Sequence, residues 1–324
     1  MSAAPLAIGI TPWDLDSAGG LAETLADQAE AAEKLGLHSL WLPEHHFGGS
    51  GAIPSPLMLL AAAAARTQRL RLGTTSYLLP LRHPIHAAEE VAVLDRLSGG
   101  RVILGLGRGF RRSTFEAFGV AVKDKRDRFE AVLAAMIQAW QGEPVAWEGD
   151  DELSRTPVQL APLPLQKPHP PLWVAAFGPK ALAQAGRLGL PYLASPIEPY
   201  ERLVENHARH REACDEAGRE RPRAVPLMRT VFSSRDVGAL ARASAGLAKQ
   251  ASTIARTRGI NLQRVAGAEV DDWAIVGEPA RVADGIARYR ETFGMTHLVV
   301  RSQIPGVERE EMLASLEQVA ELQA

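Results

Sequence analysis

The chain has 324 residues, of which 46% are hydrophobic and 23% are charged, and its formal net charge is −2. This content is enough for a large buried core, and the near-neutral charge argues against a nucleic-acid or anionic-membrane partner. The single cysteine, Cys214, excludes an internal disulfide, and without a long apolar run or a leader-like N-terminus we expect a cytoplasmic protein with no membrane span.

Short apolar runs alternate along the chain with longer segments in which apolar residues recur at helical spacing. The predicted strands are Leu6–Thr11, Leu37–Leu42, Arg69–Leu79, Arg101–Leu106, Leu172–Ala176, a short stretch near Tyr192, Val225–Phe232 and His297–Arg301. The predicted helices are Leu21–Leu35, Ser55–Arg66, Pro84–Leu97, Lys125–Trp140, Gly178–Leu188, Tyr200–Ala217, Arg235–Arg256, Pro279–Phe293 and Glu308–Leu322. This alternation predicts a single α/β domain, residues 1–324, with the (β/α)8 TIM-barrel fold; a doubly wound open sheet is the alternative.

Two segments interrupt the alternation. The stretch Glu143–Pro171 contains seven prolines, so it cannot be one regular element. We expect it to be an insertion after the fourth strand that contains one hairpin. The stretch from Arg258 to Asp272 is polar and poorly periodic, which predicts a loop after the seventh strand.

Glycines surround an arginine at the end of the fourth predicted strand, in the segment Gly105–Phe110. Glycine lets the backbone approach a ligand closely, and a guanidinium can grip a phosphate at two points. We therefore predict that Arg108 binds the phosphate of a cofactor, with a simple tight turn as the alternative. The spacing is similar to a dinucleotide fingerprint, but Phe110 stands at the third glycine and the strand is not the first of the chain.

Polar residues at the carboxyl ends of the strands are expected to meet at one mouth of a barrel. Glu44, His45 and His46 follow the second strand, and such histidines can serve as a general base, bind a metal or pack a loop. We predict no metal site, because the first strand ends Ile10-Thr11-Pro12 with neither histidine nor carboxylate. Gly178-Pro179-Lys180 opens a helix whose free N–H groups can bind an anion.

These motifs resemble the bacterial luciferase-like family of flavin-dependent monooxygenases, and the resemblance covers nearly the whole chain. It is carried by WLPEHHF (Trp41–Phe47), LGTTSYLLPLRHPIHAAEEVAVLD (Leu72–Asp95), SGGRVILGLGRGF (Ser98–Phe110) and VGEPARVADGIARYRETFGMTHLVVR (Val276–Arg301). The resemblance implies a single-domain barrel, reduced FMN as cofactor or co-substrate, and oxygenation of the substrate through a C4a-peroxyflavin.

The resemblance also implies roles for individual residues. His45 corresponds to the catalytic histidine of the family, with His46 beside it as a second catalytic candidate, and Arg108 corresponds to the phosphate-binding arginine. Thr75-Ser76 corresponds to a non-prolyl cis peptide bond beneath the isoalloxazine ring, and Arg258–Asp272 to a mobile lid. The remaining expected cofactor contacts are Phe110, Phe177, Gly178 and Ala181.

The chain departs from the family pattern at three positions. Gly107 stands where the luciferase α-subunit has a reactive cysteine, so light emission is not inferred. Gly178 and Ala181 replace the hydroxyl side chains that hold phosphate after the fifth strand, which leaves backbone amides and Lys180 for that purpose.

The leading hypothesis is a two-component monooxygenase that takes FMNH2 from a separate flavin reductase and uses O2 to oxygenate a small organic substrate. The alternatives are a deazaflavin-dependent oxidoreductase that transfers hydride on the same fold and a non-catalytic flavin-binding protein; the EHHF loop favours FMN. The family commonly dimerises through helices near the second and third strands, so we expect a homodimer. An apolar pocket is suggested by Phe47, Phe110, Phe177 and Trp273.

Overall fold

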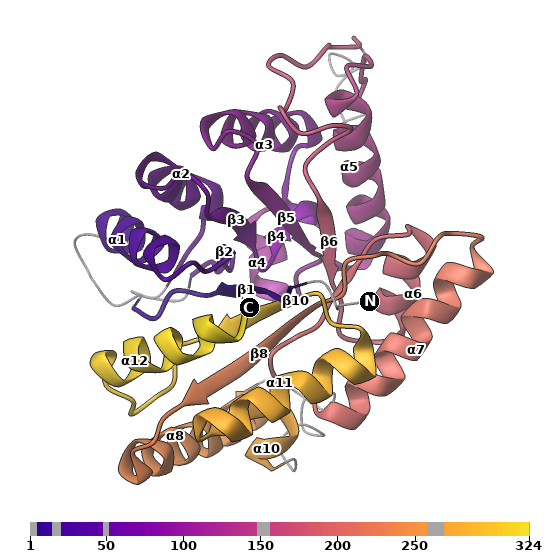
Figure 1. Ribbon diagram of the computed structural model, residues 1–324. Helices are drawn as coiled ribbons and strands as arrows, with labels where there is room; N and C mark the ends of the chain where they lie inside the picture. The colour runs from indigo at the N-terminus through magenta and orange to yellow at the C-terminus, as the bar shows by residue number, and fades with distance from the viewer. Residues whose placement is uncertain (1–4, 15–20, 48–51, 148–155, 258–268, 324) are drawn as a thin grey trace. The chain divides into compact units, whose positions relative to one another are not determined.

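The computed structural model describes residues 5–14, 21–47, 52–147, 156–257 and 269–323 (Figure 1). They form an α/β protein in which the ladders between neighbouring strands are parallel. The chain divides into two compact units. Unit one contains Met1–Leu15, Ala31–Trp41 and Ala176–Ala324, and unit two contains Asp16–Glu30 and Leu42–Ala175.

The strands of unit one are β1 (Ala7–Ile10), β2 (Ser39–Leu42, whose last residue belongs to unit two), β7 (Tyr192–Leu193), β8 (Pro226–Ser233), β9 (Ala274–Gly277) and β10 (His297–Arg301). They pair in the order β2-β1-β10-β8-β9, and Ala194, directly after β7, forms a parallel bridge with Leu227 of β8. Every residue of β8 is buried, as expected for a strand covered on both faces.

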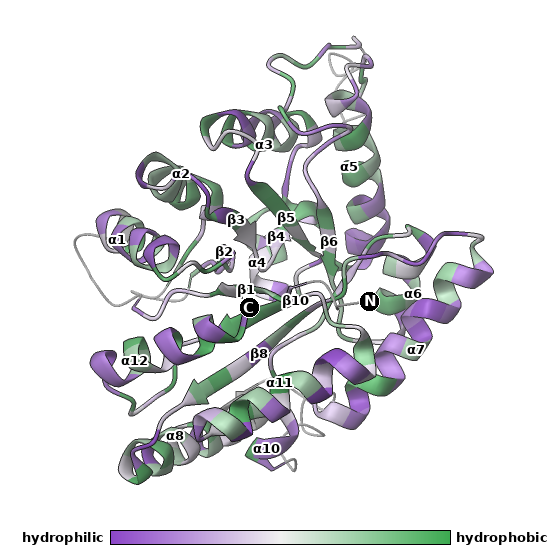
Figure 2. Ribbon diagram, viewed as in Figure 1, coloured by the Kyte–Doolittle hydropathy of each residue, from purple (hydrophilic) through white to green (hydrophobic). Residues whose placement is uncertain are grey.

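The helices of unit one are α6 (Pro179–Arg187), α7 (Tyr200–Glu216), α8 (Val237–Thr257), α10 (Val270–Trp273), α11 (Pro279–Phe293) and α12 (Arg309–Ala320). Figure 1 shows α6 beside α7, and α11 and α12 along β8. Figure 2 shows hydrophilic residues along much of α7, whereas its buried positions, Leu203, His207, His210 and Cys214 among them, recur at helical spacing.

The strands of unit two are β3 (Arg71–Thr74), β4 (Tyr77–Leu78), β5 (Val102–Gly107) and β6 (Leu172–Ala175). Strand β5 is central, because it pairs with β3, β4 and β6. The helices are α2 (Pro56–Arg66), α3 (Pro84–Leu97), α4 (Arg112–Ala117) and α5 (Lys125–Trp140), while α1 (Leu21–Lys34) runs across the division between the units.

The predicted turn before β5 is confirmed, and a neighbouring arginine anchors it. Gly99 and Gly100 have positive φ angles of 68° and 81°, which glycine adopts without a Cβ clash. The guanidinium of Arg101 then donates to the carbonyl oxygens of Ala64, Thr67 and Leu70 at 2.7–3.0 Å. The bonds to Ala64 and Thr67 satisfy carbonyls at the end of α2, so the turn, the helix and the strand are held together.

Three sequence predictions need correction or completion. The single strand predicted at Arg69–Leu79 is two short strands, β3 and β4, because the chain turns sharply at the peptide bond Thr75–Ser76, which is cis. Strand β9 and helix α4 were not predicted. Of the predicted loop Arg258–Asp272, residues 258–268 lie outside the described part of the chain, and Val270–Asp272 begin the helix α10.

The proline-rich segment contains no helix and no strand longer than a single bridge in residues 143–147 and 156–171. In its described part, Val145 and Val158 form an antiparallel bridge, and the bonds before Pro162 and Pro168 are cis. No described helix has the length and apolarity needed to cross a membrane.

Candidate functional site

The loop after β2 holds the two predicted catalytic histidines, and a backbone bridge joins it to Ile53. The backbone N–H of His45 donates to the carbonyl oxygen of Ile53 at 2.9 Å. The His45 side chain is half-buried, whereas His46 is buried. Among the described residues, no group of three or more His, Cys, Asp or Glu side chains is arranged to hold a metal ion.

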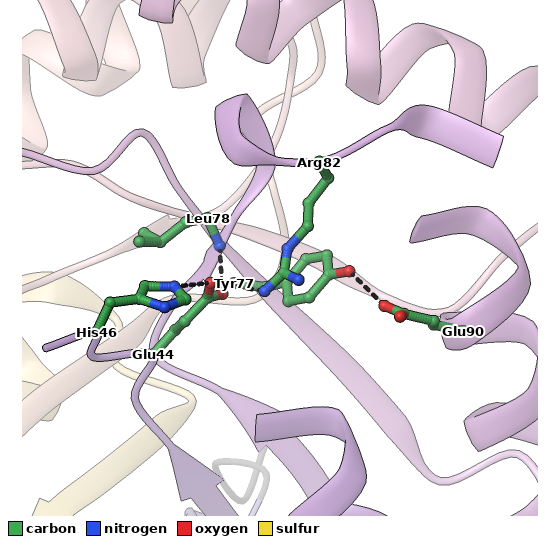
Figure 3. A network of polar contacts seen from close by, with 6 residues as sticks. All are labelled: Glu44, His46, Tyr77, Leu78, Arg82 and Glu90. Atoms are coloured by element: carbon green, nitrogen blue, oxygen red, sulfur yellow. Dashed lines mark hydrogen bonds and ion pairs between the residues drawn. The ribbon is translucent and has the colours of Figure 1, made fainter. Parts of the chain in front are cut away.

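A fully buried carboxylate, Glu44, organises this loop (Figure 3). One of its oxygens, Oε1, accepts from His46 Nε2 at 2.7 Å and from the Nη2 of Arg82 at 2.6 Å. The other, Oε2, accepts the backbone N–H of Leu78 at 2.9 Å. The carboxylate therefore joins the β2 loop to strand β4 and to the residue that follows the short 3-10 helix Leu79–Leu81.

The network continues from Arg82 to α3. The guanidinium carbon of Arg82 lies 4.5 Å from the ring centroid of Tyr77, and the Tyr77 hydroxyl donates to Glu90 Oε2 at 3.0 Å. Burial raises the pKa of Tyr77 well above its ordinary value, and the carboxylates of Glu90 and Glu44 raise it further, against the opposing charge of Arg82. Tyr77 is therefore a neutral hydrogen-bond donor at physiological pH.

The predicted cis peptide bond, Thr75–Ser76, is present and lies against β5. The Thr75 N–H donates to the Leu42 carbonyl at 2.7 Å, which places the bond beside the end of β2. A Cβ built on Gly107 would overlap the Ser76 hydroxyl and would lie 3.1 Å from Leu78 Cδ2. Any larger residue at position 107 would therefore overlap Ser76 unless that side chain moved or were shortened.

Arg108 follows Gly107, is half-buried and lies near two further cations, Lys125 and Arg126. Burial lowers the pKa of Arg108, and the charge of Arg126 lowers it further. Burial likewise lowers the pKa of Lys125, together with the charges of Arg108 and Arg126. Three like charges at one strand end disfavour one another, so an anion bound among them would be stabilised.

Lys125 and Arg126 were not identified from the sequence as site residues. They begin helix α5, 17 and 18 positions after Arg108, inside the run Lys123–Arg128. A run of mixed charge at a helix start is usually a solvated surface, so only the folded arrangement reveals its relation to Arg108. The charged run Lys123–Arg128 was the one feature of the sequence that could have indicated these two residues.

Three aromatic rings of unit two are largely or partly exposed. Phe47, with a positive φ of 57°, is 70% exposed, Phe110 60% and Phe118 43%. The ring of His46 lies edge-on to Phe118 with the centroids 4.9 Å apart, and Phe47 is 6.3 Å from Phe118. Exposed aromatic rings next to buried polar groups are typical of sites that take an apolar ligand.

The predicted residues after the fifth strand, Phe177, Gly178 and Ala181, lie in unit one. Gly178 precedes α6, and its carbonyl oxygen accepts the N–H groups of Ala181 and Leu182 at 2.8 and 3.0 Å. Phe177 is exposed and Ala181 is buried. The other predicted residues, His45, His46, Thr75, Ser76, Arg108 and Phe110, all lie in unit two.

A second buried polar cluster, in unit one, was not predicted. Glu198 is fully buried and accepts from the Tyr192 hydroxyl, the Asn206 amide and the Ser195 N–H at 2.5–2.6 Å. Burial raises the pKa of Glu198, although these hydrogen bonds and the charge of Arg229 oppose the rise. Because the bonds tie α7 to the segment after β7, we assign this cluster a structural role.

The family model for luciferase-like monooxygenases matches residues 8–296. The chain belongs to this family. Across the described residues, the features derived above therefore lie in a luciferase-like monooxygenase scaffold: the EHHF loop, the cis bond and the glycine-flanked arginine.

Relatives of this luciferase-like protein include the oxygenase component of a flavin-dependent trigonelline monooxygenase from Acinetobacter baylyi. It is 30% identical over 67% of this chain and 61% of its own length. The chain spans 54–61% of the length of the first curated relatives that it matches. A monooxygenase from Streptomyces bottropensis, RslO1, is 30% identical, with 97% of each chain covered and a TM-score of 0.81.

Two solved structures share the fold of this luciferase-like protein at lower identity. One is the oxygenating constituent of 3,6-diketocamphane monooxygenase from Pseudomonas putida in complex with FMN, at 21% identity, 98% coverage of each chain and a TM-score of 0.80. The other is the coenzyme F420-dependent tetrahydromethanopterin reductase from Methanopyrus kandleri, at 22% identity, 98% coverage of each chain and a TM-score of 0.74.

Proposed function

We propose that this protein is the oxygenase component of a two-component flavin-dependent monooxygenase. A separate reductase supplies FMNH2, and O2 is used to oxygenate a small organic substrate. Membership of the family supports this function, as does the name of the Acinetobacter baylyi relative, which describes an oxygenase component. The exposed rings of Phe47, Phe110 and Phe118 favour an apolar substrate.

The proposal includes the (β/α)8 barrel as the fold of the chain. In both units, parallel strands alternate with helices, and active sites of such barrels are built at the carboxyl ends of the strands. The proposal keeps the six predicted residues of unit two as site residues, and it keeps Phe177, Gly178 and Ala181 as expected cofactor contacts.

One observation carries the proposal, namely the three cations Arg108, Lys125 and Arg126 beside Gly107. Burial and the charge of Arg126 lower the pKa of the half-buried Arg108, and burial and the charges of Arg108 and Arg126 lower the pKa of Lys125. A phosphate group would relieve the repulsion between these cations. Gly107 provides close backbone approach at the same strand end. The side chains present therefore fit the phosphate of FMN.

Bound reduced flavin would supply the activation of O2 and the transfer of oxygen to the substrate. The protein's own contribution would be to bind the phosphate through Arg108, Lys125 and Arg126 and to keep water from the reacting atoms. His45 and His46 would accept or hold a proton at the end of β2.

Cofactor binding tests the first part of this function. Arg108→Ala should weaken FMNH2 binding by about 1.5–3 kcal/mol, the usual loss for a hydrogen bond to a charged group, in anaerobic fluorescence titrations. Lys125→Met should weaken it in the same direction, and Lys123→Met, on an exposed residue of the same run, is the matched control. A protein with no affinity for FMN, FMNH2 or a reduced deazaflavin contradicts the proposal.

Turnover tests the second part and separates the alternatives. His45→Ala should leave FMNH2 binding unchanged and slow substrate oxygenation by about 10²-fold, a typical contribution of an acid–base group. Since only the deazaflavin route proceeds without oxygen, product formation under argon with a reduced deazaflavin would favour the hydride-transfer alternative. Flavin binding without turnover by either route would indicate a flavin-binding protein.

A further inference from the structure

One ring nitrogen of the buried His46 is hydrogen-bonded to a buried carboxylate. Nε2 lies 2.7 Å from Glu44 Oε1, and this carboxylate oxygen can only accept. The ring therefore carries its proton on Nε2, and the lone pair of a neutral imidazole is on Nδ1. No hydrogen bond to Nδ1 from any described residue is present.

The carboxylate that orients the ring is itself held from three sides. Besides His46, Glu44 accepts from Arg82 on the same oxygen and from the Leu78 N–H on the other. The Glu44 side chain is 0% exposed and that of Arg82 is 20% exposed. The positive charge of Arg82 therefore balances the negative charge of the buried Glu44, and a second proton on His46 is not needed for that balance.

Arg82 is in turn fixed by contacts that do not involve the histidine. Its guanidinium lies over Tyr77, whose hydroxyl donates to Glu90 (Figure 3). The carbonyl oxygen of Arg82 accepts from Arg128 of α5 at 3.2 Å. Among the described residues, the charged and titratable groups linked to His46 through these contacts are Glu44, Arg82, Tyr77, Glu90 and Arg128. His45 is adjacent in the chain.

From this geometry we infer that Glu44 is a positioning residue that holds His46 as the Nε2–H tautomer with Nδ1 free to accept a proton, and that the cation of Arg82 offsets the charge of the carboxylate. The two neighbours act in opposite directions: the carboxylate alone favours the imidazolium, and the guanidinium opposes it. A role for His46 in turnover rests on the proposed function, whereas its tautomer and its titration do not.

Histidine NMR tests this arrangement on the full chain without flavin. Two-bond 15N–1H spectra of 15N-histidine-labelled protein report which ring nitrogen carries the proton, and the signal lost in His46→Gln identifies the ring. We expect the Nε2–H tautomer in the unaltered protein. The Nδ1–H tautomer would overturn the inference.

The opposing effects of the two charges are then measured by pH titration of the same signals. Removing one opposite or like charge at this distance should move the midpoint of the His46 titration by about 1 pH unit or more. We expect it to move to lower pH in Glu44→Gln and to higher pH in Arg82→Met. Shifts in the same direction, or no shift in either variant, would refute the role assigned to Arg82.

Matched variants separate charge from packing. Arg82→Lys keeps the cation and should leave the midpoint within a few tenths of a pH unit. Arg82→Gln, which also removes the charge, replaces Arg82→Met if that variant does not fold. Tyr77→Phe keeps the ring under the guanidinium and should likewise leave the midpoint in place. Arg66→Met, which removes an arginine paired with Asp27 at the surface, controls for the loss of a cation elsewhere.

The pH profile of kcat/KM links the arrangement to turnover. In Arg82→Met its acidic limb should move to higher pH, and in Glu44→Gln to lower pH, in parallel with the NMR midpoints. If the NMR results hold but the protein binds no flavin, the proposed function fails and the inference about the ring stands. If flavin binds and turnover occurs but the limb moves with neither variant, His46 has no proton role in turnover and that part of the inference is wrong.

Discussion

His207 of α7 shows what burial without a partner does to a titratable side chain. Its ring lies among those of Tyr192 and Phe293, with centroids 5.0 and 4.8 Å away. Its Nε2 is buried and has no hydrogen-bond partner among the described residues. Burial, with smaller contributions from the charges of Arg211, His210 and Arg229, lowers the pKa of His207 from 6.5 to about 3.

This lowered pKa makes the free energy of unfolding depend on pH. The folded state keeps His207 neutral, so its contribution is fully present above pH 6.5 and is lost as the pH falls from 6.5 toward 3. The slope from this group is at most about 1.4 kcal/mol for each pH unit. His207→Phe should therefore flatten the dependence in urea titrations between pH 7 and pH 4, while His86→Phe, on an exposed residue of α3, should not. Equal slopes in both variants would contradict this account.

Site residues that belong to a sequence motif could be predicted. Site residues that approach the motif only in the folded chain could not. Arg108 could be singled out because glycines flank it directly after a strand. The partner that fixes Glu44, Arg82, lies 38 positions away, and nothing in the residue pattern relates the two. Lys125 and Arg126 were missed for the same reason, since their proximity to Arg108 depends on how α5 returns past the end of β5.

At the scale of elements, helix boundaries were predicted better than strand boundaries. The helices at Pro84–Leu97, Lys125–Trp140 and Pro279–Phe293 have the predicted ends, because proline at the first turn or glycine after the last marks them. Strand β9 has only four residues and follows a polar segment, too short a run for periodicity to detect. The break between β3 and β4 occurs at Thr75–Ser76, where no proline or glycine marks a turn.

The packing of α6 on α7 depends on the absence of a side chain at Gly186. A Cβ there would lie 2.6 Å from both Ala213 Cβ and the His210 carbonyl oxygen. Because backbone atoms cannot move aside, the two helices would have to separate.

Gly186→Ala should accordingly destabilise the protein by about 1–3 kcal/mol, the usual cost of overpacking, as measured by urea denaturation. The matched control is Gly238→Ala in α8, where a Cβ would meet only the flexible side chains of Asp236 and Arg242. That change should stay within about 0.5 kcal/mol of the unaltered protein. A Gly186→Ala protein as stable as the control would show that the helices repack freely.

At the scale of the whole molecule, the two units share continuous elements. Helix α1 and strand β2 each contribute residues to both units. Unfolding of one unit must therefore break an element that belongs partly to the other. We expect a single calorimetric transition whose van't Hoff enthalpy equals the measured enthalpy. Two resolved transitions would contradict a single domain over residues 1–324.

The homodimer is expected from the family resemblance, and exposed apolar side chains on α2 and α3 would suit its interface. Met58 is 74% exposed, Leu97 64% and Val93 42%. The double variant Met58→Glu/Leu97→Glu should reduce the mass measured by light scattering from that of a dimer to that of a monomer. Val237→Glu, on a residue of α8 that is 77% exposed, should leave the mass unchanged. A protein that is already monomeric without substitutions would rule out this interface.

The tight approach of Gly107 to Ser76 makes these two positions interdependent. A cysteine at position 107, the residue of the luciferase α-subunit, would overlap the Ser76 hydroxyl unless that side chain were shortened. Gly107→Cys alone should thus be poorly tolerated, and Ser76→Gly should rescue it, so the cost of the pair is smaller than the sum of the single costs. A lineage that replaced this glycine with a cysteine would have had to shorten the serine first, so the overlap constrains the order of the two substitutions.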